Sequence, residues 1–261
     1  MDKYRFSRRK FLKTAGVAGA MTSLSPIDTL ANDEVQVPDQ FKGFTFLFQG
    51  DSITDGKWGR NNDPNHILGH GYVFSVASRI GADFPQSGFS FYNRGISGNK
   101  VSDLDKRWST DTLALKPDVL SLLIGINDVG ALVANQPDAG DLEAFGRVYR
   151  KLLKTSLEIN PDLLLVLGIP FVFPVGARKE KWELWHEATL ARAQIIRMIA
   201  EEFDAILIDF ASLFEQAQKS TPIDYWIWDG VHPTVFGHEL MAREWIKQVG
   251  SRLAFLKSYH Y

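Results

Sequence analysis

The sequence predicts a single α/β domain whose core is a five-stranded parallel sheet covered by helices on both faces. Five short apolar runs alternate with longer segments in which apolar residues recur at helical spacing. Parallel strands need long crossover connections, which are usually helical, so this alternation indicates a parallel sheet between two helical layers. No linker, internal repeat or low-complexity tract follows residue 40, and one domain is therefore expected.

The five runs are rich in Val, Ile, Leu or Phe and are bounded by Gly, Pro, Asn or Asp, which is typical of buried strands. The predicted strands are 44–49, 89–93, 119–124, 163–167 and 205–208. Two of the segments between them place apolar side chains on one face of a helix. One face consists of Leu142, Phe145, Val148, Leu152, Ser156 and Ile159, and the other of Leu190, Ala193, Ile196, Ile199 and Phe203. The segments 55–69 and 170–186 are too long for tight turns and are expected to be functional loops or lids.

Composition narrows the class of protein. The chain has 261 residues, a formal charge of -2, 45% hydrophobic residues and no cysteine, which is typical of a folded globular protein. The lack of cysteine excludes a disulfide scaffold, a thiol nucleophile, thiolate-bound zinc and an iron–sulfur cluster. No apolar run reaches the roughly 18 residues of a membrane-spanning helix, and basic residues beyond residue 13 are scattered. The sequence therefore predicts neither an integral membrane protein nor a nucleic-acid partner.

The first 31 residues are predicted to be an export signal. Arg8 and Arg9 lie in a basic segment, a modest apolar stretch covers residues 14–27, and Ala31 ends a possible cleavage site. The arginine pair resembles the twin-arginine signal, which exports folded proteins in bacteria, so a periplasmic or secreted location is expected. A basic helical N-terminus of the folded domain is the alternative. Removal of residues 1–31 leaves a domain at 32–261 with a net charge of -6, an unfavourable charge for binding DNA or anionic membranes.

Glycine-containing polar clusters follow the first three predicted strands, and a fourth cluster follows the fifth predicted strand and the helix expected after it. In an open α/β sheet, ligands bind outside the carboxyl ends of the strands, so these clusters are candidate site segments. Taken singly, each has a structural explanation: Ser52 and Asn127 could cap helices, Gly98 could serve a turn, and His232 could lie on the surface. The clusters occupy residues 50–54, 93–99, 125–128 and 229–233.

Asp229 and His232 are the two residues whose spacing most clearly indicates a catalytic role. Pro233 disfavours helical backbone at His232, so a turn is expected in which the carboxylate reaches one imidazole nitrogen. Such a contact fixes the tautomer and leaves the other nitrogen free to take a proton.

The four clusters together resemble the SGNH hydrolases, also called GDSL esterases. Gly50-Asp51-Ser52, Gly98, Gly125-Ile126-Asn127-Asp128 and Asp229-Gly230-Val231-His232-Pro233 match the four family blocks in order. The resemblance covers residues 44–240, with Ile53 where many members have leucine. It implies a flavodoxin-like α/β/α sandwich of three layers around a five-stranded parallel sheet.

The resemblance also implies roles for these residues. Ser52 is the expected nucleophile, His232 its general base, and Asp229 the carboxylate that orients the imidazole. The backbone N–H groups of Ser52 and Gly98 and the side-chain amide of Asn127 are the expected oxyanion hole. Asp51 and Asp128 are expected to brace these loops through backbone hydrogen bonds. The sequence lacks the G-x-S-x-G, G-x-G-x-x-G, P-loop and H-E-x-x-H motifs, so no nucleotide, metal or other cofactor is predicted.

The blocks beginning at Gly50 and Asn93, and the segment 226–229, are similar to bacterial acetylxylan esterases of the SGNH type. We therefore expect removal of acetyl groups from an acetylated poly- or oligosaccharide. Trp228 would line the site, and Trp58, Trp182 and Trp185 in the long loops would suit sugar contact or simple packing. The alternatives are a lipid-directed esterase (lysophospholipase or thioesterase), an acyltransferase, and a non-catalytic carbohydrate-binding protein. Related esterases often form homo-oligomers.

Overall fold

The computed structural model describes residues 37–61 and 63–259, and the predicted signal peptide lies outside them. Five parallel strands form one sheet with the order β2-β1-β3-β4-β5. This confirms the predicted fold class, and the observed strands differ from the predicted ones by at most one residue at each end. Their bounds are β1 Thr45–Gly50, β2 Ser90–Asn93, β3 Val119–Leu123, β4 Leu164–Gly168 and β5 Ile206–Ile208.

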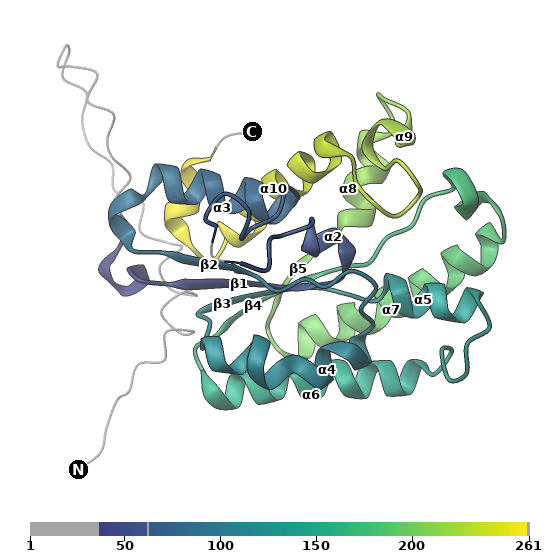
Figure 1. Cartoon of the computed structure of the whole chain (residues 1–261), viewed down its shortest axis with the longest axis horizontal. Helices are drawn as coiled ribbons and strands as arrows, with labels where there is room; N and C mark the ends of the chain where they lie inside the picture. Colours follow the sequence, from purple (N-terminus) through teal and green to yellow (C-terminus); the bar gives the residue numbers. More distant parts are fainter. Residues whose placement is uncertain (1–36, 62, 260–261) are drawn as a thin grey trace.

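Helices cover both faces of the sheet (Figure 1). Helices α3, α8 and α10 lie on one face, and α4, α6 and α7 lie on the other. The α-helices are α2 Ser52–Asp55, α3 Tyr72–Asp83, α4 Val101–Asp111, α5 Ile126–Val133, α6 Leu142–Ile159, α7 Trp182–Glu202, α8 Phe210–Ala217, α9 Ile223–Trp226 and α10 Val235–Val249. Short 3₁₀ turns are η2 Asp39–Phe41, η3 Pro85–Ser87, η4 Leu113–Leu115, η5 Gly176–Lys179 and η6 Ala254–Ser258.

Side-chain alternation along the strands divides the interior into two hydrophobic clusters. On β1, Phe46 and Phe48 pack with α3 and α10, whereas Leu47 between them packs with α4 and α6. All three side chains are fully buried. A strand between two helical layers buries both of its faces, so its sequence is a continuous apolar run. This explains why the strands were predicted accurately.

Two features of the predicted helices are wrong. Helix α7 begins at Trp182, so the second long loop ends several residues earlier than residue 186. Leu142, Ile159 and Leu190 were expected on buried faces but are 36%, 52% and 54% exposed. The first two lie at the ends of α6, where a helix longer than the strands extends past the sheet.

Among the described residues, no helix combines the length and apolar character needed to cross a bilayer.

The strand order places a topological switch point between β1 and β3. The chain moves outward to β2 on one side of β1 and to β3, β4 and β5 on the other. At such a point the loops after neighbouring strands separate and leave a crevice at the carboxyl edge. Here β1 leads directly into α2, and β3 leads into α5, so the clusters that contain Ser52 and Asn127 begin on the two sides of this crevice.

Candidate active site

Ser52 begins helix α2 directly after β1. The helix is capped by Asp51, whose Oδ1 accepts a hydrogen bond from the N–H of Ile53 at 3.0 Å. The cap is therefore Asp51 and not Ser52, so the structural explanation for this serine does not hold. Neither the N–H of Ser52 nor that of Gly98 donates to another described residue, and both are available to a ligand.

His232 lies in a closed loop between α9 and α10. Asp229 Oδ1 accepts hydrogen bonds from the N–H groups of Val231 at 3.0 Å and His232 at 2.8 Å. The loop is tied at its base by an antiparallel bridge between Ile227 and Pro233. The segment is thus a turn, as the proline predicted. The tight curvature of this turn depends on Gly230, which lies between Asp229 and His232 and has a positive φ of 92°.

The structure brings Ser52, His232 and Asp229 into one hydrogen-bonded chain. Ser52 Oγ lies 2.8 Å from His232 Nε2, and His232 Nδ1 lies 2.8 Å from Asp229 Oδ2. Partial burial raises the pKa of Asp229, but hydrogen bonds from the ring and N–H of His232 and from Val231 outweigh it, and the pKa lies well below its usual value. An ionised carboxylate at Nδ1 favours the tautomer with its proton there, so Nε2 can accept the serine proton.

Gly98 and Asn127 lie on the two neighbouring segments. Gly98 has φ 84°, and a Cβ at this position would meet nothing within 4 Å, so its backbone faces open space. Asn127 is the second residue of α5, whose cap residue is Gly125 with no side-chain cap. The amide of Asn127 donates to the carbonyl of Asn99 at 3.1 Å instead of capping its own helix. One amide N–H remains for a ligand.

Two carboxyl groups, the buried Asp51 and the half-buried Asp128, support these loops, as expected from the sequence. Asp51 accepts from Ile53, and Asp128 Oδ2 accepts from the N–H of Val101 at 3.3 Å. Burial raises the pKa of Asp51 to about 7, with repulsion from Asp128 acting in the same direction. Burial also raises the pKa of Asp128 to about 6, although the Val101 N–H and the charge of Arg192 oppose the shift.

Sequence reasoning missed three residues that hold the site together. Asp55 Oδ2 accepts from the N–H and Oγ of Ser97 at 2.9 and 2.8 Å, joining α2 to the segment of Gly98. Arg107 Nε donates to Asn99 Oδ1 at 2.8 Å from α4. Arg192, which is 1% exposed, donates to the Ala139 carbonyl at 2.7 Å behind α5. Nothing local in the sequence singles these residues out, because their partners lie far away along the chain.

The predicted tryptophans lie in different places. Trp228 is 63% exposed, and its ring lies 6.1 Å from the His232 ring at an angle of 24°. Trp58 lies in the loop after α2, with Nε1 donating to the carbonyl of Gly95 at 2.8 Å. Both are therefore next to the candidate site. Trp185 is on α7 and packs against the hydrophobic core, beside Arg178.

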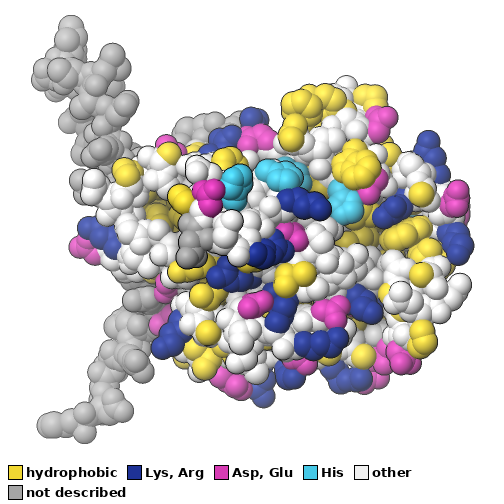
Figure 2. All heavy atoms as spheres, viewed as in Figure 1, with side chains coloured by type: hydrophobic (Ala, Val, Ile, Leu, Met, Phe, Trp, Pro, Cys, Tyr) yellow, Lys and Arg dark blue, Asp and Glu magenta, His cyan; other side chains and the backbone are white. Residues whose placement is uncertain are grey.

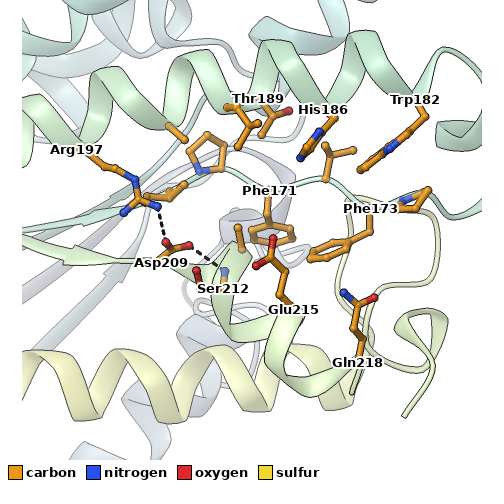
Figure 3. A pocket seen from close by; sticks show the side chains of 17 residues that line it. Phe171, Phe173, Trp182, His186, Thr189, Arg197, Asp209, Ser212, Glu215 and Gln218 are labelled. Carbon is orange, nitrogen blue, oxygen red and sulfur yellow. Dashed lines mark hydrogen bonds and ion pairs between the residues drawn. The ribbon is translucent and has the colours of Figure 1, made fainter. Parts of the chain in front are cut away.

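Trp182 lines a separate cavity of about 460 Å³ between α7 and α8. In Figure 3, His186 extends from α7 on the side above Phe171 and Phe173, and Glu215 extends toward the same space from α8 on the opposite side. The cavity lining contains none of Ser52, Gly98, Asn127 and His232. Trp182 is therefore not one of the side chains around Ser52.

The five-stranded parallel sheet and the four polar clusters define a class, the GDSL/SGNH hydrolases with a flavodoxin-like α/β/α fold. Residues 48–240 match the GDSL-like lipase/acylhydrolase family model. The chain therefore belongs to the GDSL-like lipase/acylhydrolase family, and it is a carboxylic ester hydrolase. Residues 5–25 match the twin-arginine translocation signal, which confirms the predicted export to the periplasm or the exterior.

Individual relatives agree with this assignment. The chain is 34% identical to an acetylxylan esterase of Geobacillus stearothermophilus over 80% of its own length and 94% of the relative. The crystal structure of that organism's Axe2, an acetylxylan esterase, has a TM-score of 0.70 at 32% identity, covering 80% of this chain and 95% of Axe2. A GDSL-like protein from Parabacteroides merdae has a TM-score of 0.76 at 38% identity, with 80% and 97% covered.

Proposed function

We propose that this protein is an esterase that removes acetyl groups from acetylated xylan or its fragments. The observation that carries the proposal is the continuous pair of 2.8 Å contacts from Ser52 Oγ through His232 to Asp229. The similarity to an acetylxylan esterase over most of the chain supports the choice of an acetylated carbohydrate. The exposed ring of Trp228 beside His232 suits contact with a sugar face.

In the proposed reaction, Ser52 Oγ attacks the acetyl carbonyl carbon while His232 Nε2 takes the hydroxyl proton. The carbonyl oxygen becomes an oxyanion, which the N–H groups of Ser52 and Gly98 and the amide of Asn127 stabilise. Collapse of this intermediate breaks the ester bond, and His232 returns the proton to the departing sugar oxygen. Asp229 stabilises the transient imidazolium.

The remaining acetyl-enzyme is hydrolysed by the same groups. Water attacks the acetyl carbon, His232 takes a proton from it, and the bond to Ser52 Oγ breaks. His232 then protonates the serine, and acetate leaves. No cofactor is needed for either half, because the imidazole moves every proton.

The test is an acyl-chain-length series on the wild type and Ser52→Ala, together with acetate release from acetylated xylan. We expect the wild type to prefer acetyl esters and Ser52→Ala to lose about 10⁴-fold or more in kcat. A preference for octanoyl or longer esters would contradict the acetyl assignment. Full activity of the alanine variant would contradict the nucleophile.

A lipid-directed esterase is the second candidate, because further apolar side chains are exposed near Trp228. Tyr225 and Phe236 stack at 4.7 Å and are 44% and 50% exposed, and Val235 is 67% exposed. Such a surface would also suit an acyl chain or a lipid interface. The same chain-length series separates the two functions.

A further inference from the structure

A polar groove begins within one helical turn of Ser52. It has a volume of about 550 Å³ and is lined by Asp55, Lys57, Trp58, Arg60, Ile96 and Ser97. Asp55 ends the short helix that Ser52 begins, and Ser97 directly precedes Gly98. A bound sugar chain that presents an ester to Ser52 can therefore extend into this groove.

The groove carries an excess of positive charge. Its one acid, Asp55, is buried and pairs with Arg60 through two contacts of 3.0 and 3.1 Å. Lys57 is an exposed residue of the lining. Arg94 is not part of the lining but lies beside it, with its guanidinium near the Trp58 ring and donating to the carbonyl of Asn93. Within the described part of the chain, no carboxylate forms an ion pair with either Lys57 or Arg94. Two positive charges thus remain uncompensated, although the folded domain as a whole is acidic.

The Trp58 ring lies against two guanidinium groups. The guanidinium of Arg60 lies 3.9 Å from the centre of the Trp58 ring, and that of Arg94 lies 5.3 Å from it. The indole is held in place by its hydrogen bond to Gly95. In Figure 2, Lys and Arg side chains gather over the middle of the face, where α2 and the strand ends lie in Figure 1.

An aromatic ring beside unpaired cations has the chemistry to hold a sugar that carries a carboxylate. The ring contacts the apolar face of a pyranose, and guanidinium and ammonium groups form charge-assisted hydrogen bonds to carboxylate oxygens. A neutral pyranose would form no charge-assisted contact with Lys57 or Arg94. This inference rests on the proposed esterase function: we infer that the groove binds a uronic acid unit of the acetylated carbohydrate, close to the ester that is cleaved.

The experiment compares two acetylated xylo-oligosaccharides of equal length, one neutral and one bearing a uronic acid branch. Acetate release gives kcat and KM for each with the wild type, Lys57→Gln and the double variant Lys57→Gln/Arg94→Gln. We expect the KM of the wild type to be about three- to tenfold lower for the acidic substrate. This preference should shrink in the single variant, disappear in the double variant, and weaken with added NaCl.

Lys154→Gln is the matched control, because Lys154 is an exposed lysine on α6 and makes the same change in net charge. It should keep the full preference, and thermal unfolding should show all variants folded. Equal KM values for the two substrates, or a preference that survives in the double variant, would overturn the inference while leaving the esterase function intact. Acetate release from neither substrate would instead contradict the proposed function and the inference with it.

Discussion

The side-chain amide of Asn127 donates a hydrogen bond of 3.1 Å to the backbone carbonyl of Asn99. This contact joins the start of α5 to the segment after β2, although the two residues are 28 positions apart. It fixes the direction of the amide, so the remaining N–H has a defined orientation before any substrate binds. A preorganised donor stabilises developing charge without the cost of reorienting during the reaction.

Replacing this amide should therefore affect the chemical step more than binding. We expect Asn127→Ala to lower kcat on 4-nitrophenyl acetate about 10²- to 10³-fold and to change KM little, since the donor acts mainly on the oxyanion. Asn160→Ala is the matched control, because Asn160 also donates its amide to a backbone carbonyl, that of Pro117, at 2.9 Å. Its kcat should stay within a few-fold of the wild type. Equal losses in both variants would show that Asn127 acts only through the fold.

Local sequence patterns predicted the strands and the four polar clusters, because burial on both faces and sharp turns restrict the residues at those positions. The pairing of Asp229 with His232 was also predictable, since the two are three residues apart and precede a proline. By contrast, the contact between Asp55 and Ser97 spans 42 residues, and the buried Arg192 reaches its acceptor across 53. Contacts of this kind depend on the packing of whole elements, for which a single sequence has no local pattern.

The exposed Trp228 offers a direct test of carbohydrate contact. We expect Trp228→Ala to raise KM for an acetylated xylo-oligosaccharide about three- to tenfold, because it removes an aromatic surface beside His232. The small ester 4-nitrophenyl acetate should show a smaller change in KM. Trp182→Ala removes a tryptophan from the separate cavity between α7 and α8 and should leave both values unaltered. If both tryptophan variants behave alike, Trp228 does not contact the sugar.

Gly230 is the residue that allows the Asp229–His232 turn. Its φ is 92°, and a Cβ there would lie 2.5 Å from the carbonyl oxygen of Phe173. Gly43 also has a positive φ, 72°, but a Cβ there meets nothing within 4 Å. We expect Gly43→Ala to cost about 1 kcal/mol of unfolding free energy and Gly230→Ala about 2 kcal/mol more, with loss of activity. Urea denaturation measures both, and equal costs would contradict the steric explanation.

His238 provides a pH-dependent link between α10 and α3. Its Nδ1 accepts a hydrogen bond of 3.1 Å from the N–H of Tyr72, the first residue of α3, which otherwise has no side-chain cap. Burial lowers the pKa of His238 to about 4, and the nearby His70 and His232 contribute in the same direction. Only the neutral ring can accept this hydrogen bond, so protonation removes the cap and places a charge in a poorly solvated position.

The sign of the effect follows from the proton balance. Between pH 6.5, the usual histidine value, and about pH 4, the unfolded chain binds a proton at His238 that the folded protein does not. The stability that the neutral ring provides is thus complete above pH 6.5 and is lost as the pH falls to about 4. His238→Asn keeps an acceptor but cannot titrate. We expect the unfolding free energy of the wild type, relative to this variant, to fall by about 3 kcal/mol from pH 7 to pH 4.

Urea denaturation at several pH values measures this difference directly. His66→Asn is the control, because the His66 side chain is 67% exposed and pairs with Asp63 at the surface. Every carboxylate affects the acid stability of all three proteins, so the informative quantity is each variant's difference from the wild type and not the absolute stability. The His66→Asn difference is the reference for an exposed histidine, and the His238→Asn difference should change more with pH than this reference does. A His238→Asn difference that does not change between pH 7 and pH 4 would mean that His238 titrates alike in the folded and unfolded protein, and that it caps α3 without making that cap sensitive to acid.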